Sequence, residues 1–436
     1  MMDTQRLYEI YLQHPEVVTD SRAVREGSLF FALRGGRFDG NQFAAGALEA
    51  GAAYAVVDEP TLARPGGRFL LVEDVLTTLQ ALARHHRRQF DIPVIGITGS
   101  NGKTTTKELS AAVLGSHYRL HYTQGNLNNH IGLPLTLLAM PTGIEVAVIE
   151  MGANHQGEID MLCRITEPTH GLITNIGKAH LEGFGGIEGV KKGKSELYRY
   201  LAQAGGTVFI NRDEPFLEEL AAPAEKKVFY RRSETPSPTE PDFEAKLLAT
   251  QPFVSAAFLG RQGQLVEVHS RLPGAFNFSN IMTAITLGKY FKVPDEKIAA
   301  AIEGYTPGNN RSQIRTYNGN TLIMDAYNAN PTSMREALLA FRSMDGGPKL
   351  AIIGEMLELG AESRAEHEAI ALLATSQHFR EVAFVGKEFR NAAEIVGCRH
   401  FDDVAALKSW FDAQGYRGYH ILIKGSRGNQ LEKLLD

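Results

Sequence analysis

The stretch IPVIGITGSNGKTTTKELSAAVLG, residues 92–115, decides the fold of the central part of this chain. A mostly apolar run comes directly before a glycine-containing turn, and a helical pattern follows the turn. Glycines in such a turn let backbone N–H groups approach a phosphate, and the N-terminus of the following helix adds a positive partial charge. Residues 99–106 are therefore predicted to form a phosphate-binding loop between a strand and a helix.

Individual residues of this loop have predicted roles in binding a nucleoside triphosphate. Lys103 is expected to contact the β- and γ-phosphates, and the hydroxyl of Thr104 to ligate Mg²⁺. The pattern G-x-x-x-x-G-K-[ST] is met except at its first glycine, where Ile97 stands. A glycine-rich turn that merely opens a helix is the alternative interpretation. The residues predicted to form the loop around ATP are Gly99, Ser100, Asn101, Gly102, Lys103, Thr104 and Thr105.

Strand-like and helical segments alternate after the loop, which predicts a parallel sheet covered by helices on both faces. The strand at 145–151 carries Glu150 near its end. Because ligands of open α/β sheets gather at the carboxyl ends of strands, Glu150 is a candidate Mg²⁺ ligand. A carboxylate at a strand end is, however, more often simply solvated. His180 follows the strand at 171–177 and is either a ligand of a second metal ion or an ordinary hydrogen-bonded histidine.

The length of 436 residues exceeds what one ordinary core supports, so several domains are expected. The sequence predicts an α/β protein of three domains: a small α/β unit at 1–82, a central P-loop domain with a parallel sheet at 83–310, and a Rossmann-like domain at 311–436. The first unit includes a helix from Asp74 that must end before Pro93. Between 225 and 272 the pattern predicts a loop and an antiparallel appendage. The loop YTPGNNR (305–311) is typical of a hinge.

Composition excludes several classes of function. A net charge of −5 offers no basic surface for nucleic acid. Cys163 and Cys398 have no metal-type spacing and are predicted to be buried thiols in a reducing compartment. Neither an apolar leader nor an apolar run of membrane-spanning length is present, so a cytoplasmic protein without membrane contact is expected.

Several ordered motifs are similar to those of the Mur ligase family. TGSNGKTTT (98–106), TQGNLNNHIGLPLTLL (123–138), VIEMGANHQGEI (148–159) and NIGKAHLEGFG (175–185) resemble its ATP-binding central domain. Residues 19–43 resemble the UDP-binding N-terminal domain. Residues 272–285, 325–334, 352–360 and 422–428 resemble the branch that adds D-alanyl-D-alanine. The resemblance spans nearly the whole chain.

The resemblance implies an activity and its cofactors. An ATP-dependent ligase would join D-alanyl-D-alanine to a UDP-N-acetylmuramoyl-tripeptide through an acyl phosphate, with ATP and two Mg²⁺ ions, and a monomer is expected. Lys194 falls on a lysine that the family carboxylates with CO₂, although from the residues alone it is a solvent-facing lysine. The implied catalytic residues are Lys103, Glu150, His180 and Lys194, and the implied metal ligands are Thr104, Glu150, His180 and carboxylated Lys194.

The resemblance also implies ligand contacts, residue by residue. Further nucleotide contacts would come from Asn277, Asn280, Arg311 and Asp325. Contacts to the UDP-linked peptide and the dipeptide would come from Ser21, Arg22, Asn126, Asn128, Asn129, Tyr327, Asn328 and Asn330. Four positions depart from the usual pattern: Asn41 and Phe276 replace histidine, His130 replaces glutamate, and Glu355 replaces aspartate. None of these departures removes a phosphate or metal ligand.

Three other functions share some of these features. A P-loop kinase would use the same loop but release a phosphorylated product, and a nucleotide-dependent switch would bind ATP without turnover. A sibling ligase, either diamino-acid-adding or of the folylpolyglutamate type, would share the loop and the lysine. The DNPR string of the diamino-acid-adding sibling is missing from the last domain. Rotation about 305–311 is expected to complete the active site by bringing three domains together.

Overall fold

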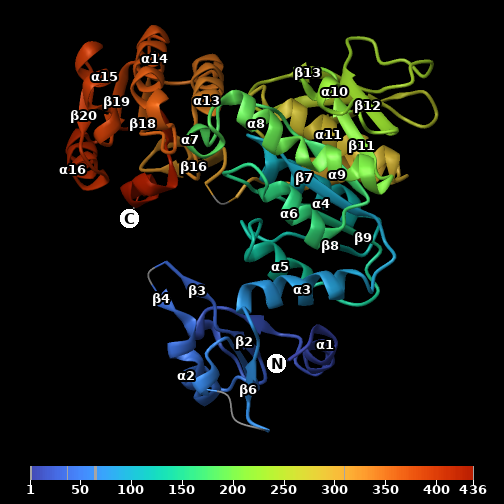
Figure 1. Ribbon diagram of the computed structural model, residues 1–436. Coiled ribbons are helices and arrows are strands. Elements are labelled where there is room, and N and C mark those ends of the chain that lie inside the picture. Colours follow the sequence, from blue (N-terminus) through green and yellow to red (C-terminus); the bar gives the residue numbers. More distant parts are fainter. Residues whose placement is uncertain (1, 37, 63–65, 309, 436) are drawn as a thin grey trace.

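The computed structural model describes residues 2–36, 38–62, 66–308 and 310–435, and three α/β units follow one another along the chain (Figure 1). The first unit has a four-stranded parallel sheet in the order β1-β2-β5-β6. Helix α2 packs on one face of this sheet, and α1 and α3 pack on the other. Its elements are β1 (Val17–Val18), β2 (Leu29–Phe31), β5 (Tyr54–Val57), β6 (Phe69–Leu71), the hairpin β3 (Arg34–Gly35) and β4 (Phe38–Asp39), α1 (Thr4–Gln13), α2 (Ala44–Glu49), α3 (Val75–Arg87), and the 3₁₀ turns η1 (Ser21–Ala23), η2 (Gly40–Phe43) and η3 (Pro60–Leu62).

The central unit is built on a nine-stranded sheet in the order β15-β14-β13-β12-β11-β10-β7-β9-β8. Strands β7, β9 and β11 are buried along their whole length, as predicted for a parallel sheet covered on both faces. The strands are β7 (Val94–Thr98), β8 (Leu120–Tyr122), β9 (Val146–Glu150), β10 (His170–Ile173), β11 (Thr207–Asn211), β12 (Lys226–Arg232), β13 (Phe243–Ala249), β14 (Ser255–Leu259) and β15 (Leu265–His269). The helices are α4 (Lys103–Gly115), α5 (Gly132–Leu138), α6 (Glu158–Thr166), α7 (Leu181–Phe184), α8 (Ile187–Lys194), α9 (Glu196–Ala204), α10 (Leu217–Leu220), α11 (Asn277–Tyr290) and α12 (Asp295–Gly304).

The segment 225–272 matches only in part its prediction as a loop and an antiparallel appendage. Strands β12 and β13 continue the main sheet in parallel, and only the pairs β13–β14 and β14–β15 are antiparallel. Helix α11 covers one face of these strands, while part of the other face meets solvent. Alternation of apolar and polar residues indicates a half-buried strand, but it does not determine whether the strand runs parallel or antiparallel to its neighbours.

The last unit has a six-stranded sheet in the order β16-β17-β21-β18-β19-β20, parallel except at β16. Helices α13, α14 and α15 cover one face, and α16 with the final 3₁₀ turns covers the other. The elements are β16 (Gln313–Tyr317), β17 (Asn320–Asp325), β18 (Lys349–Gly354), β19 (Glu381–Val385), β20 (Arg399–Phe401), β21 (His420–Lys424), α13 (Pro331–Ser343), α14 (Ser363–Ser376), α15 (Arg390–Ile395), α16 (Val404–Gln414), and the 3₁₀ turns η4 (Gly360–Glu362), η5 (Lys387–Phe389), η6 (Arg427–Asn429) and η7 (Leu431–Leu435). The α/β fold class is thus confirmed.

Helix α3 connects the first two units. The Asp74 carboxylate caps its N-terminus by accepting from the Thr77 N–H at 2.6 Å, and the helix ends before Pro93, as predicted. One side of α3 packs on α1, and it also contacts α5 and α6 of the central unit. The predicted domain boundary at residue 83 therefore falls inside α3, whereas the boundary at 310 falls in the loop between α12 and β16.

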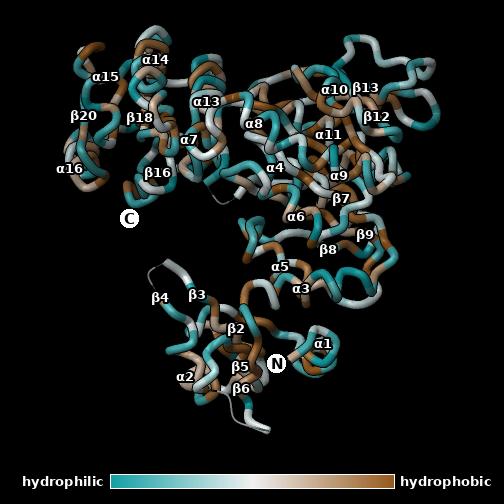
Figure 2. Tube along the Cα trace, viewed as in Figure 1, coloured by the Kyte–Doolittle hydropathy of each residue, from teal (hydrophilic) through white to brown (hydrophobic). Residues whose placement is uncertain are grey.

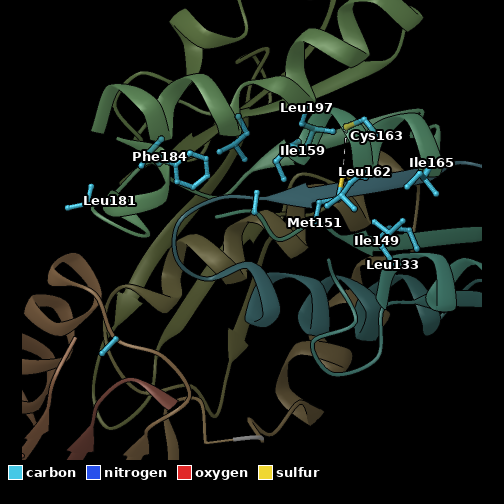
Figure 3. Close-up of a cluster of buried hydrophobic side chains, with 14 of the residues drawn as sticks. Leu133, Ile149, Met151, Ile159, Leu162, Cys163, Ile165, Leu181, Phe184 and Leu197 are labelled. Carbon is cyan, nitrogen blue, oxygen red and sulfur yellow. Dashed lines mark hydrogen bonds between the residues drawn. The ribbon is translucent and has the colours of Figure 1, made fainter. Parts of the chain in front are cut away.

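The hydrophobic core continues beneath the phosphate-loop strand. Figure 3 shows apolar side chains of α6, α7 and the end of β9 packed together, with the sulfurs of Met151 and Cys163 3.9 Å apart. Figure 2 shows the hydrophobic segments of the N-terminal unit gathered in its interior. Cys163 is buried, but Cys398 is only partly buried, which corrects the prediction that both thiols are enclosed. Within the described ranges, no helix has the length and apolar character needed to cross a membrane.

Candidate functional site

A cavity of about 370 Å³ lies between the central and last units, at the carboxyl ends of their strands. The structure brings most of the predicted site residues to its wall, although the sequence distributes them over more than two hundred positions. Those residues are Ser100, Asn101, Gly102, Lys103, Thr104, Thr105, Asn128, Asn129, Glu150, His180, Asn277, Asn280, Arg311, Asp325, Tyr327, Asn328 and Asn330.

The phosphate loop runs from the end of β7 into α4. Ile97, the departure from the usual loop motif, is fully buried inside β7, so the turn begins only at Gly99. Gly102 has φ +77°, and a Cβ there would lie 2.6 Å from Asn280 Oδ1, so both conformation and space favour glycine. Lys103 Nζ donates to the carbonyl oxygens of Gly99 (2.7 Å) and Ser100 (3.2 Å). Burial lowers the pKa of Lys103 to about 8, against the opposing effect of the Glu150 carboxylate.

Glu150 lies beside this loop because β7 and β9 are parallel and pair Ile97 with Glu150. Its Oε1 accepts from Thr104 Oγ1 (3.2 Å) and from Asn128 Nδ2 (2.7 Å). Its Oε2 is buried and has no hydrogen-bond partner among the described residues, and the ammonium of Lys107 comes no closer to it than 4.0 Å. A buried anionic oxygen without a donor is costly unless a cation meets it, so Glu150 and Thr104 fit an Mg²⁺ ion.

The described residues contain no cluster of three His, Cys, Asp or Glu side chains arranged for a metal. Mg²⁺ is commonly held by one or two carboxylates together with water and substrate phosphates. His180 lines the cavity, and its Nδ1 contacts the Glu358 carboxylate after β18 of the last unit. The sequence alone did not indicate this partner, and metal binding by His180 stays a prediction.

Lys194 is buried rather than solvent-facing, which corrects the interpretation from residues alone. Its side chain has no exposed surface, and Nζ donates to the Ala153 carbonyl oxygen at 3.1 Å. The ammonium also lies 5.0 Å from the centre of the Phe184 ring. Burial, and then repulsion from Lys103, lower the pKa of Lys194 well below its ordinary value. Lys194 lies behind Ala153, which itself lines the cavity.

Two of the asparagines predicted to contact the nucleotide, Asn277 and Asn280, lie in the first turn of α11 and form a buried chain of hydrogen bonds. Asn277 Nδ2 donates to the Pro273 carbonyl oxygen (2.7 Å), and Asn280 Nδ2 donates to Asn277 Oδ1 (2.9 Å). Thr106 Oγ1 donates to Asn280 Oδ1 at 2.9 Å, which connects α11 to the phosphate-loop helix. This side of the cavity is therefore held rigidly against the loop.

Lys424 is a buried lysine on the cavity wall that was not predicted from the sequence. Its Nζ lies 2.5 Å from Asp325 Oδ2 and its side chain is 2% exposed. The ion pair forms because β17 and β21 are neighbouring parallel strands whose register pairs Asp325 with Lys424. In the sequence, each of the two residues is the last residue of an apolar strand. This common placement at a strand end is the signal by which the pair could have been found.

The last unit is docked on the phosphate loop. Asn330 forms a capping box with Ser333 at the start of α13, and its Nδ2 also donates to Asn101 Oδ1 at 2.7 Å. Nearby, Lys178 of the central unit forms ion pairs with Glu366 and, at 4.0 Å, with Glu362. Contact between these two units is thus present, while rotation about 305–311 stays a prediction.

A second cavity of about 270 Å³ adjoins the first and shares Thr104, Arg311 and Tyr327 with it. The guanidinium of Arg311 lies 3.7 Å from the centre of the Tyr327 ring, and that of Arg427 lies 5.5 Å from it. The remaining walls include the predicted substrate residue Asn126 and also Gly125, Asn310, Ala326, Arg427 and Glu432.

The predicted UDP contacts lie elsewhere, in the first unit. Ser21 and Arg22 belong to the turn η1 and line neither cavity, and Arg22 is paired with Asp20 at 2.7 Å. Asn41, which stands where the family usually has histidine, is 5% exposed. Its Nδ2 donates to the carboxylates of Asp39 and Asp58, each at 2.8 Å. It therefore holds the β3–β4 hairpin against the sheet of the first unit.

Two carboxylates, Glu214 and Glu336, interact across the interface of the central and last units. Burial, and then the Glu336 carboxylate, raise the pKa of Glu214 from 4.5 to about 7. Between these pH values the folded protein keeps a proton that the unfolded chain has released, so stability falls as pH rises through this window. Glu214→Gln is expected to increase the free energy of unfolding by on the order of 1 kcal/mol at pH 8, after allowance for partial solvent exposure.

Melting temperatures of both proteins from pH 5 to pH 8 check this prediction. The gain should be largest at pH 8 and fade towards pH 4.5. Glu219→Gln, which alters an exposed carboxylate on the nearby helix α10, is the matched control and should show no such trend. A gain for Glu214→Gln that does not grow with pH contradicts the prediction.

Three family models match consecutive parts of the chain. "Mur ligase family, catalytic domain" matches residues 16–87, "Mur ligase middle domain" matches residues 97–288, and "Mur ligase, glutamate ligase domain" matches residues 310–427. Together they account for most of the sequence, and each falls largely on one of the three structural units.

Individual relatives match over almost their full length. The UDP-N-acetylmuramoyl-tripeptide–D-alanyl-D-alanine ligase of Bacillus subtilis (strain 168) is 36% identical, with 96% of this chain and 92% of that protein covered. The crystal structure of MurF from Acinetobacter baumannii has 31% identity and a TM-score of 0.85, covering 99% of this chain and 97% of that chain. MurF ligase from Thermotoga maritima in complex with ADP has 27% identity and a TM-score of 0.83, covering 100% and 97%.

Proposed function

The chain belongs to the Mur ligase family, and we propose that its site joins D-alanyl-D-alanine to UDP-N-acetylmuramoyl-tripeptide at the expense of ATP. Relatives that match the chain over almost their full length have this activity in their names. One observation carries the proposal: the phosphate loop and a Glu150 oxygen without a hydrogen-bond donor lie in a cavity that adjoins a second, arginine-lined cavity. A nucleotide site beside a site for another anionic reactant suits an ATP-dependent ligase.

The proposed reaction converts an unreactive carboxylate into an acyl phosphate. The terminal carboxylate of the tripeptide attacks the γ-phosphorus of ATP, and ADP leaves. The amine of D-alanyl-D-alanine then attacks the acyl carbon and loses a proton, and the tetrahedral intermediate expels phosphate. Lys103 stabilises the charge on the transferred phosphoryl group, and the backbone of residues 99–104 orients the triphosphate.

Thr104 and Glu150 would hold Mg²⁺, which when bound neutralises negative charge on the triphosphate. His180 and a carboxylated Lys194 are proposed to contribute to a second ion. The amine of Lys194 would add to the carbon of CO₂ and lose one proton, giving a carbamate with a single negative charge. Complete burial and a lowered pKa support this proposal, because they keep the amine neutral and nucleophilic.

The dipeptide is proposed to bind in the second cavity. D-alanyl-D-alanine carries a carboxylate at one end and an amine at the other, and the amine must approach the acyl phosphate beside Thr104. Arg427 also lines this cavity, and a guanidinium can bind a carboxylate through two parallel hydrogen bonds. We therefore assign the carboxylate end of the dipeptide to Arg427.

Arg427→Met is expected to raise the KM for D-alanyl-D-alanine about tenfold or more, because a charge-assisted hydrogen bond is lost. The KM for ATP should change little. Steady-state phosphate release with each substrate varied in turn checks both values. Arg417→Met is the matched control, since Arg417 is an exposed arginine of the same unit that lines neither cavity. Equal KM values for the dipeptide in Arg427→Met and the wild type would remove Arg427 from the proposal.

The overall function is tested by phosphate release with ATP, UDP-N-acetylmuramoyl-tripeptide and D-alanyl-D-alanine, each omitted in turn. Release of ADP and free phosphate that requires all three, with formation of the pentapeptide product, supports the ligase. A stable phosphorylated product would indicate a kinase. Consumption of a different amine would indicate a sibling ligase, and ATP binding without turnover would indicate a switch. The cytoplasmic and monomeric state expected from the sequence stays a prediction.

A further inference from the structure

Lys107 is a fully buried lysine that no step of the proposed reaction uses. It lies on α4, one helical turn after Lys103, and its side chain has 0% exposure. A buried ammonium is costly unless its protons are accepted by nearby groups. The groups that surround Lys107 therefore indicate what it stabilises.

The ammonium of Lys107 meets a loop that carries predicted substrate residues. Nζ donates to the carbonyl oxygen of Thr123 (2.7 Å) and, more weakly, to that of Gly125 (3.4 Å). It also lies 2.9 Å from the Glu108 carboxylate. Its distance to Glu150 Oε2 is 4.0 Å, which is too long for a hydrogen bond. The carbonyl groups of the loop and the Glu108 carboxylate, rather than Glu150, are therefore the close partners of this ammonium.

Residues 123–129, here named the acceptor loop, follow β8 and reach both cavities. Thr123 Oγ1 accepts from the Glu150 N–H at 3.0 Å, and the Asn128 carbonyl oxygen accepts from the Gly152 N–H at 2.8 Å. These bonds fix the two ends of the loop, while residues 124–127 are exposed. Lys107 reaches the backbone of this exposed part at Gly125. Asn126 lines the second cavity, and Asn128 lines the first.

We propose that Lys107 is a positioning residue that holds the acceptor loop against the helix carrying Lys103 and Thr104. By this contact, the loop presents the carboxylate of the UDP-linked peptide to the γ-phosphate of ATP. The proposal rests on the proposed function. It differs from a purely structural role because loss of Lys107 weakens peptide binding more than ATP binding.

Lys289 on α11 provides a matched control. Its Nζ donates to the Leu259 carbonyl oxygen (2.6 Å), lies 3.6 Å from the Asp295 carboxylate, and lies 5.5 Å from the centre of the Phe258 ring. Lys107 has the same three kinds of contact, with the Tyr122 ring at 5.6 Å. Lys289 lines neither cavity, so Lys289→Met should lower stability without changing either KM selectively.

The test compares steady-state kinetics of the wild type with Lys107→Met, Lys107→Gln and Lys289→Met. Lys107→Met is expected to raise the KM for UDP-N-acetylmuramoyl-tripeptide about tenfold or more, because hydrogen bonds from a charged group are lost. The KM for ATP should change less than about threefold, which is a smaller effect than the loss of one hydrogen bond from a charged group would produce. Lys107→Gln keeps an N–H donor and should recover part of the loss.

Three outcomes would overturn the proposal. The KM values for ATP and peptide rise equally in Lys107→Met, or Lys107→Met behaves like Lys289→Met, or both Lys107 variants fail to fold, which would show a purely structural role. If only Lys107→Met fails to fold, Lys107→Gln is judged by the same KM ratio. Turnover by the wild type is measured first. Its absence would contradict the proposed function but would leave the role proposed for Lys107 to be tested by binding. In that case, the dissociation constant of UDP-N-acetylmuramoyl-tripeptide measured by calorimetry replaces its KM.

Discussion

Replacing Lys103 with alanine is expected to lower kcat for phosphate release by about 10²-fold or more, by analogy with loss of a donor that stabilises developing charge. Lys103 Nζ now donates to two carbonyl oxygens of the phosphate loop, at 2.7 and 3.2 Å. With ATP bound, the same ammonium is expected to contact the β- and γ-phosphates. Its removal is expected to leave the charge on the transferred phosphoryl group without the stabilisation that this ammonium would provide.

Single-turnover and steady-state phosphate release with saturating substrates measure this effect on kcat. Lys103→Arg keeps the charge but not the geometry, and its kcat should fall between those of Lys103→Ala and the wild type. Lys192→Ala, which removes an exposed lysine, should retain wild-type kcat. A Lys103→Ala enzyme with a kcat within threefold of the wild type would exclude Lys103 from charge stabilisation, since threefold lies far below the loss of about 10²-fold expected for such a donor.

Lys194→Ala is the second change with a large expected effect, a loss of kcat on the order of 10²-fold if a carbamate helps to hold or orient a metal ion. Lys194 is fully buried next to Phe184 and Ala153, so truncation leaves a space at the end of α8. Formate or acetate at high concentration should enter this space and restore part of the activity. Lys192→Ala on the same helix should show neither the loss nor the restoration.

Carbon-13 NMR with labelled bicarbonate gives a readout independent of activity. A carbamate signal should be present in the wild type and in Lys192→Ala, and absent in Lys194→Ala. Wild-type activity of Lys194→Ala with and without added carboxylates would refute the carbamate, as would the same labelled signal in both variants. The lysine could then be assigned only to packing around Ala153.

The phosphate loop and its sheet could be predicted because their determinants are local. Residues 92–115 contain a buried strand, the glycines of the turn and the following helix in one continuous segment. Glu150 was placed beside this loop on one assumption, that β7 and β9 are parallel, and the structure confirms the pairing. The direction of the strands at the sheet edge was less predictable, since residues 243–246 of β13 alternate in hydropathy although this strand pairs with β12 in parallel.

The sequence by itself determined the order of the three α/β units and the phosphate loop, because strand and turn patterns act over short segments. Most other residues on the cavity wall were implied only by the resemblance to the Mur ligase family. Only the tertiary structure decided the burial of Lys194 and Lys107, the pairing of Lys424 with Asp325, and the contact of His180 with Glu358. The pairs with Asp325 and Glu358 join residues 99 and 178 positions apart. Burial and such long-range contacts arise from the packing of separate elements, and no local pattern of residues specifies them.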